Sequence, residues 1–80
     1  MPRFFFDFHD NGLSLTDEIG AEIGGEQEAR TRARLTLRDA VADATQHRDM
    51  GSIAIVVRDH RRRAIIRAAA HWSVSAEDRA

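Results

Sequence analysis

The chain has 80 residues, of which 12 are basic and 13 acidic, and it contains no cysteine. This length is enough for one domain over residues 1–80 with a small hydrophobic core, and the absence of cysteine excludes disulfides, thiol catalysis and zinc sites built from paired cysteines. The net charge of −1 is not the basic excess of a dedicated nucleic-acid-binding protein, so any positive patch must come from local clustering.

Aromatic residues dominate residues 3–10 and predict the first strand. A strand places alternate side chains on opposite faces. Phe4, Phe6 and Phe8 therefore share one face, and Phe5 lies on the other.

A turn and a second, shorter strand follow. Asn11-Gly12 is among the strongest hairpin signals, because both residues tolerate positive φ. Residues 13–16 resume the alternation of a strand. Residues 17–25 contain three glycines and no sustained period, which indicates an irregular connection anchored by Ile19 and Ile23.

From Glu26 the apolar period changes to 3.6 residues, which predicts a helix over residues 26–47. Most residues of its apolar stripe are alanine, so this helix can lie close to the surface that it covers. The stripe comprises Ala29, Ala33, Leu37, Ala40, Val41 and Ala44.

A second hairpin completes the chain. Residues 52–58 form a β-branched run without polar alternation, as is typical of a strand covered on both faces, and residues 64–74 return as the last strand after a polar turn. The expected fold class is α+β, with ββαββ order and a four-stranded, mainly antiparallel sheet that packs one long helix on one face.

One helix covers only one face of such a sheet, so apolar residues on the other face would need a second cover. We therefore expect a homodimer packed through a sheet face or an edge, as a protein–protein interaction module. The candidate interface residues are Phe5, Ile53, Ile55 and Trp72. A monomer with scattered apolar surface residues is the alternative.

Arginines cluster at the turn of the second hairpin. They could hold phosphates, which makes a nucleic-acid-binding protein the alternative function, and by analogy of fold alone an antitoxin-like regulatory protein. A solvated turn whose arginines pair with Asp59 explains the same cluster without a ligand. The candidate contact residues are Arg58, Arg61, Arg62, Arg63 and Arg67.

Asp7, His9, Asp10 and His71 could in principle meet as a metal or acid–base site. Spacing brings Asp7 and His9 together on one strand face but does not place the others beside them. No Gly-rich phosphate loop or Ser-His-Asp arrangement is visible. We therefore expect no catalytic residues, no metal, no cofactor and a non-enzymatic function.

No apolar run approaches the roughly 20 residues that span a bilayer. Asp7 interrupts the apolar stretch near the N-terminus too early for a signal peptide. We expect a cytoplasmic protein with no membrane partner.

The opening Met1-Pro2-Arg3-Phe4-Phe5-Phe6, continued by His9-Asp10-x-Gly12, resembles a family of short bacterial proteins of unknown function. Similar features are Asp17-Glu18-x-Gly20, Glu28-Ala29-Arg30 and Val57-Arg58-Asp59, so that the likeness runs from residue 1 to about residue 74. The chain departs from the family at Asn11-Gly12, where Asp-Gly or Gly-Gly is usual, and at Arg61-Arg62-Arg63, where the family tends to carry a glycine. The resemblance implies a single α+β domain and assigns no catalytic residue.

Overall fold

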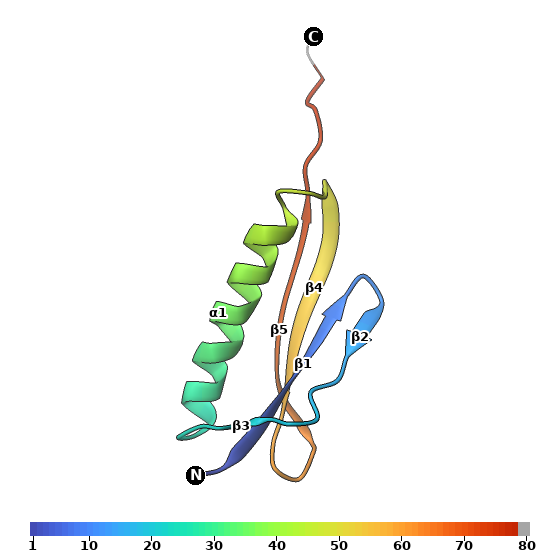
Figure 1. The fold of residues 1–80 in the computed structure, drawn as a ribbon. Helices are drawn as coiled ribbons and strands as arrows, with labels where there is room; N and C mark the ends of the chain where they lie inside the picture. Colours follow the sequence, from blue (N-terminus) through green and yellow to red (C-terminus); the bar gives the residue numbers. More distant parts are fainter. Residues whose placement is uncertain (79–80) are drawn as a thin grey trace.

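A computed structural model of the protein describes residues 1–78 of the domain expected over residues 1–80, so residues 79–80 lie outside the described part. One helix packs against one face of an antiparallel sheet (Figure 1). The elements are β1 (Arg3–Asp10), β2 (Leu13–Leu15), β3 (Ala21–Glu22), α1 (Glu26–Ala44), β4 (Met50–Arg58) and β5 (Ala64–Ser73). The α+β class is confirmed, and the expected ββαββ order is matched except for the additional short strand β3.

The described residues form a sheet in the order β2-β1-β4-β5, and β3 also pairs with β1. Both β2 and β3 lie antiparallel to β1, at Phe8–Asp10 and at Arg3–Phe4 respectively. They act as one strand that residues 16–20 interrupt. The sheet thus has five strands where the sequence predicted four, because Ala21–Glu22 of the expected irregular connection returns to β1.

Some element boundaries also differ from the prediction. The helix ends at Ala44 and not at residue 47, because the N–H groups of Gln46 and His47 bond to the carbonyls three residues earlier and close the last turn. Strand β4 begins at Met50, which pairs with Ser73, rather than at residue 52. Strands β2 and β5 each end one residue earlier than expected.

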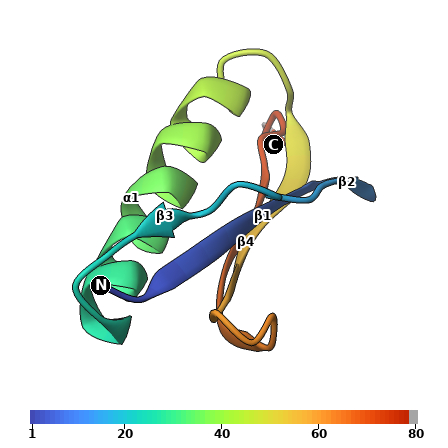
Figure 2. The same cartoon turned by 60° about the horizontal axis from the view of Figure 1, so that its bottom comes forward.

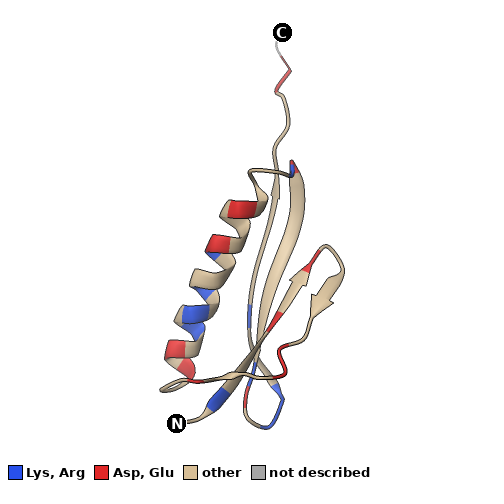
Figure 3. Cartoon of the chain, viewed as in Figure 1, with Lys and Arg blue, Asp and Glu red and all other residues tan. Residues whose placement is uncertain are grey.

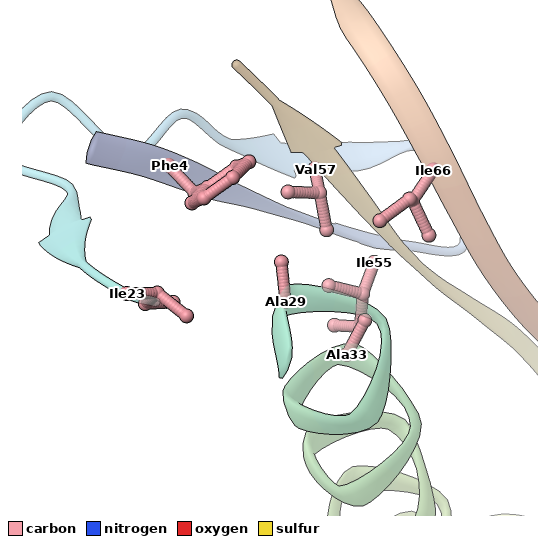
Figure 4. Packing of buried hydrophobic residues seen from close by; sticks show 7 residues of the cluster. All are labelled: Phe4, Ile23, Ala29, Ala33, Ile55, Val57 and Ile66. Carbon is pink, nitrogen blue, oxygen red and sulfur yellow. The ribbon is translucent and has the colours of Figure 1, made fainter. Parts of the chain in front are cut away.

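The core lies between α1 and the helix-facing side of the sheet (Figure 4). Ala29 and Ala33 are fully buried against it. Because alanine has so little bulk, the helix backbone approaches the strands closely, and larger side chains of the sheet fill the remaining space. The other buried members of this cluster are Phe4, Ile23, Ile55, Val57 and Ile66.

The two apolar residues expected to anchor the connection between the first hairpin and the helix behave differently. Ile23 is fully buried in the core, and its N–H donates to the carbonyl of Pro2 at 3.0 Å. Ile19 is 81 % exposed. The expectation is therefore confirmed for Ile23 and wrong for Ile19.

The helix covers only part of its side of the sheet. It lies mainly against β4 and β5, and β2 lies away from it in two views (Figures 1 and 2). Leu13 and Leu15 of β2 are consequently exposed, although they share a face with the half-buried Phe8. No helix within residues 1–78 is long and apolar enough to cross a membrane.

Candidate functional site

An ion pair lies on the side of the sheet opposite the helix. Asp7 of β1 and Arg58 of β4 have side chains only 12 % and 14 % exposed. Arg58 donates from Nε to Asp7 Oδ2 at 2.6 Å and from Nη2 to Oδ1 at 3.0 Å, which is bidentate pairing. The Arg58 hydrogen bond lowers the pKa of Asp7 below its ordinary value of 3.8, against the opposing effect of burial.

The same pair holds the loop that interrupts the β2–β3 edge, which we call the Asp17 loop (residues 16–20). The N–H of Asp17 donates to Asp7 Oδ1 at 2.9 Å, and its carbonyl accepts from Arg58 Nη2 at 2.8 Å. The Asp17 carboxylate accepts the N–H groups of Phe6, Ile19 and Gly20. Burial raises the pKa of Asp17, but these N–H groups and Arg58 outweigh it, so the pKa is lowered overall.

The Asp17 loop covers Phe5, which the sequence offered as a candidate interface residue. Phe5 is only 5 % exposed. The guanidinium carbons of Arg58 and Arg62 lie 5.0 and 4.8 Å from its ring centroid, within cation–π range. Gly20 lies so close that a Cβ built on it would be 2.9 Å from Phe5 Cε2. Phe5 is therefore covered by its own chain and presents no apolar surface to a partner.

The other candidate interface residues lie on the helix-facing side. Ile53 and Ile55 are buried beneath α1. Trp72 is half-buried near the end of β5. Its Nε1 donates to the backbone carbonyl of Arg48 at 3.0 Å, and the guanidinium carbon of Arg48 lies 5.3 Å from its ring centroid. These placements remove Phe5, Ile53 and Ile55 from the expected interface, because a partner could not reach them.

Of the candidate arginines at the second hairpin, only Arg58 is withdrawn from solvent, and the other four are exposed. Arg58 is paired with Asp7, Arg62 lies over Phe5, and Arg63 Nε is 3.8 Å from Asp59 Oδ2. Figure 3 shows the basic turn at the end of β4. Within residues 1–78, the side chains of Arg61 and Arg67 make no ion pair or hydrogen bond. The structure thus does not gather the five arginines into one open patch.

The residues considered for acid–base or metal chemistry are also separated. The His9 Nδ1 and Ser14 Oγ lie 2.9 Å apart across the first hairpin. Asp10 points to the helix side, where its Oδ1 lies 2.8 Å from Arg48 Nη1. His71 lies on another strand, β5, opposite Ser52 of β4. No group of three or more potential metal ligands gathers within residues 1–78.

A different feature, the open edge of β5, was not singled out from the sequence. Strand β5 pairs with β4 from Ala64 to Ser73, with a β-bulge at Ile65 opposite Val57 and Arg58, and it has no neighbour on its other side among the described residues. Beside it lies an open, mainly apolar groove of about 420 Å³, here called the helix–β5 groove. It is lined by Arg34, Leu37, Arg38, Val41, Ala42 and Ala70. Strand order, which the sequence does not display, decides which strand is left at the edge.

The residues that carry the family resemblance mostly hold the fold together. Asp10, Asp17 and Arg58 make the contacts described above, and Asp59 accepts the N–H groups of Arg61 and Arg63 within its turn. No curated protein and no solved structure matches the chain. The family model described as "Domain of unknown function (DUF6894)" matches residues 3–75. The chain therefore belongs to this family of domains of unknown function.

Proposed function

We propose that this domain is a non-enzymatic protein–protein interaction module that acts as a homodimer, joined along the open edge of β5. The observation that carries the proposal is a long edge strand with no proline and one charged residue, Arg67, which stays in regular register with β4 from Ile66 to Ser73, beyond the bulge at Ile65. Edge strands in monomers are usually short, charged, bulged or covered, because free N–H and C=O groups invite another strand.

The opposite edge of the same sheet provides the comparison. It consists of β2 and β3, with three and two residues, and the Asp17 loop separates them. That edge offers no continuous row of backbone groups. The two edges are therefore unequal, and only β5 is suited to strand addition.

The helix–β5 groove adds apolar surface beside this edge. Leu37 and Val41 of the helix are half-buried and line this groove together with Ala70 of β5. A second copy that extends the sheet would cover this groove as well as the strand. An 80-residue domain has a small core, and further apolar burial in a dimer would stabilise it.

The hairpin arginines support nucleic-acid binding less well. Phosphate contact requires open guanidinium groups, and the side chain of Arg58 is only 14 % exposed in its pair with Asp7, while Arg62 lies over Phe5. The remaining exposed arginines do not give the chain a basic excess, since its net charge is −1. Protein association is therefore the function that the geometry favours.

The test is the mass in solution together with one backbone substitution. Sedimentation equilibrium at tens of micromolar should give twice the chain mass of 9.0 kDa. Ala69→Pro should give the monomer mass, because proline removes an N–H that points away from β4 and is tolerated at such positions. Ala69→Val, which keeps the N–H, is the matched control and should remain a dimer. A monomer mass for the native chain would contradict the proposal.

A further inference from the structure

The face of the sheet opposite the helix contains a hollow between β4 and β5. Ile53 and Ile55 lie beneath the helix, so Ala54 between them points to the other face, because side chains alternate along a strand. Ala54 lies opposite Ala69 of β5. These two small side chains form the floor of an open hollow of about 320 Å³, here called the Ala54–Ala69 hollow. The other side chains that line it on this face are those of Ser52, Arg67 and His71.

Three side chains that can donate hydrogen bonds border this floor. Arg67 and His71 lie on the same face of β5, with Ala69 midway between them. Their Cα atoms are four residue steps apart, roughly 13 Å, so both side chains can lean over Ala69 and leave room for one small group between them. Ser52 lies directly opposite His71 and adds a hydroxyl. The guanidinium is always charged, and an imidazole donates an N–H in either protonation state.

The electrostatic surroundings of the hollow favour an anion. Strands β4 and β5 contain no acidic residue (Figure 3). Arg67 is exposed, and its side chain makes no ion pair or hydrogen bond within residues 1–78. On the neighbouring strand β1, Asp7 points to the same face, but its carboxylate is bonded to Arg58. A positive charge therefore borders the hollow without an acidic partner among the described residues, although the whole chain has a net charge of −1.

From this arrangement we infer that the Ala54–Ala69 hollow binds one phosphate group, carried by a small molecule. A phosphate monoester fits because its terminal oxygens accept hydrogen bonds in different directions, and a guanidinium can hold two of them. His71 and Ser52 would donate to the remaining oxygen. A nucleic-acid strand fits less well, since its affinity comes from many phosphate contacts and Arg67 is the one arginine that lines the hollow. This site is separate from the proposed dimer contact, because it lies on the face of β5 and not along its edge.

Titration of the native protein with glycerol phosphate at constant ionic strength tests the site, with the backbone amides followed by NMR. Saturable shifts should be confined to the strands around the hollow and give a dissociation constant in the millimolar range. Arg67→Ala should weaken binding about tenfold, because a charge-assisted contact is lost. Arg61→Ala is the matched control and should leave the dissociation constant nearly unchanged. Arg61 is also exposed, and its side chain makes no ion pair or hydrogen bond within residues 1–78.

A second variant separates a built site from a general effect of charge. Ala69→Leu fills the hollow and keeps every charge, so it should abolish binding. Sedimentation and circular dichroism first establish that each variant has the mass and fold of the native protein. The site is overturned if Arg67→Ala and Arg61→Ala weaken binding equally, if Ala69→Leu still binds, or if the native protein shows no saturable shift at tens of millimolar. A single-stranded oligonucleotide that binds more tightly per phosphate than glycerol phosphate would overturn the assignment to a single phosphate group.

Discussion

The carboxylate of Asp7 and the guanidinium of Arg58 hold three segments of the chain in one hydrogen-bonded cluster: β1, β4 and the Asp17 loop. Taking charged groups out of water is unfavourable unless their hydrogen bonds are replaced. Here the cluster supplies the replacements, and no buried side-chain nitrogen or oxygen atom in the described part of the chain lacks a partner.

Neutralising this carboxylate should destabilise the fold. Asp7→Asn turns the charge-assisted bonds from Arg58 into weaker neutral ones, and we expect a loss of about 2 kcal/mol in the free energy of unfolding. Urea denaturation followed by circular dichroism measures it. Asp39→Asn is the control, since its pair with Arg38 is about 70 % exposed on both sides and should contribute little. Equal effects of the two substitutions would contradict the role given to Asp7.

Acid should act through the same groups. The pKa values of Asp7 and Asp17 are lowered in the folded protein, so the unfolded chain, with aspartate pKa values of about 3.9, takes up protons first as the pH falls. The stabilisation is complete well above pH 4 and is lost as the pH falls through the lowered values. We expect the urea midpoint to fall steeply below about pH 4. Asp7→Asn should show a shallower fall, and an unchanged profile would count against this account.

Gly20 is the glycine of the Asp17 loop for which the structure leaves no room for a side chain. Its φ is +75°, and an added Cβ would lie 2.9 Å from the carbonyl oxygen of Phe4. Gly20→Ala should therefore cost about 2–3 kcal/mol in unfolding free energy through strain and steric clash. Gly12→Ala is the matched control, because Gly12 also has positive φ but nothing within 4 Å, and it should cost about 1 kcal/mol. Similar losses at both positions would show that the close contact is unimportant.

Among the elements, α1 shows how small residues set the distance between layers. Ala33 is fully buried on the sheet-facing side and Leu35 is 46 % exposed away from it. Ala33→Leu should force helix and sheet apart at a cost of about 1–3 kcal/mol. Leu35→Ala should change the unfolding free energy by less than about 0.5 kcal/mol. Thermal unfolding of both variants tests this, and tolerance of leucine at position 33 would mean that the layers are loosely packed.

For the whole molecule, the proposed dimer makes stability depend on concentration. Dimer formation stabilises the folded state by mass action, and each tenfold increase in concentration should add about 1.4 kcal/mol per mole of dimer to the apparent free energy of unfolding. Val41→Asp, which charges the helix–β5 groove, should abolish this dependence, and Leu35→Asp on the other side of the helix should preserve it. Urea midpoints measured from 1 to 100 µM would decide, and a constant midpoint for the native chain would refute the dimer.

The sequence by itself determined the order and type of the main elements, because these depend on local periodicity. The alternation of Phe4, Phe6 and Phe8, the Asn11-Gly12 turn and the alanine stripe of the helix each predict a feature that the structure contains. The α+β class follows from these patterns alone.

Only the tertiary structure decided what each face and edge is exposed to. Phe5 is covered by Arg58, Arg62 and the Asp17 loop, contacts between residues far apart in the chain that no local period encodes. The short strand β3 likewise depends on its partner in β1. Strand order left β5 at an open edge because pairing, unlike periodicity, is a long-range choice. The sequence left a sheet face and a sheet edge open as places for a partner. The structure buries Phe5, Ile53 and Ile55 and leaves the edge of β5 open, and this edge is where we propose that a second copy binds.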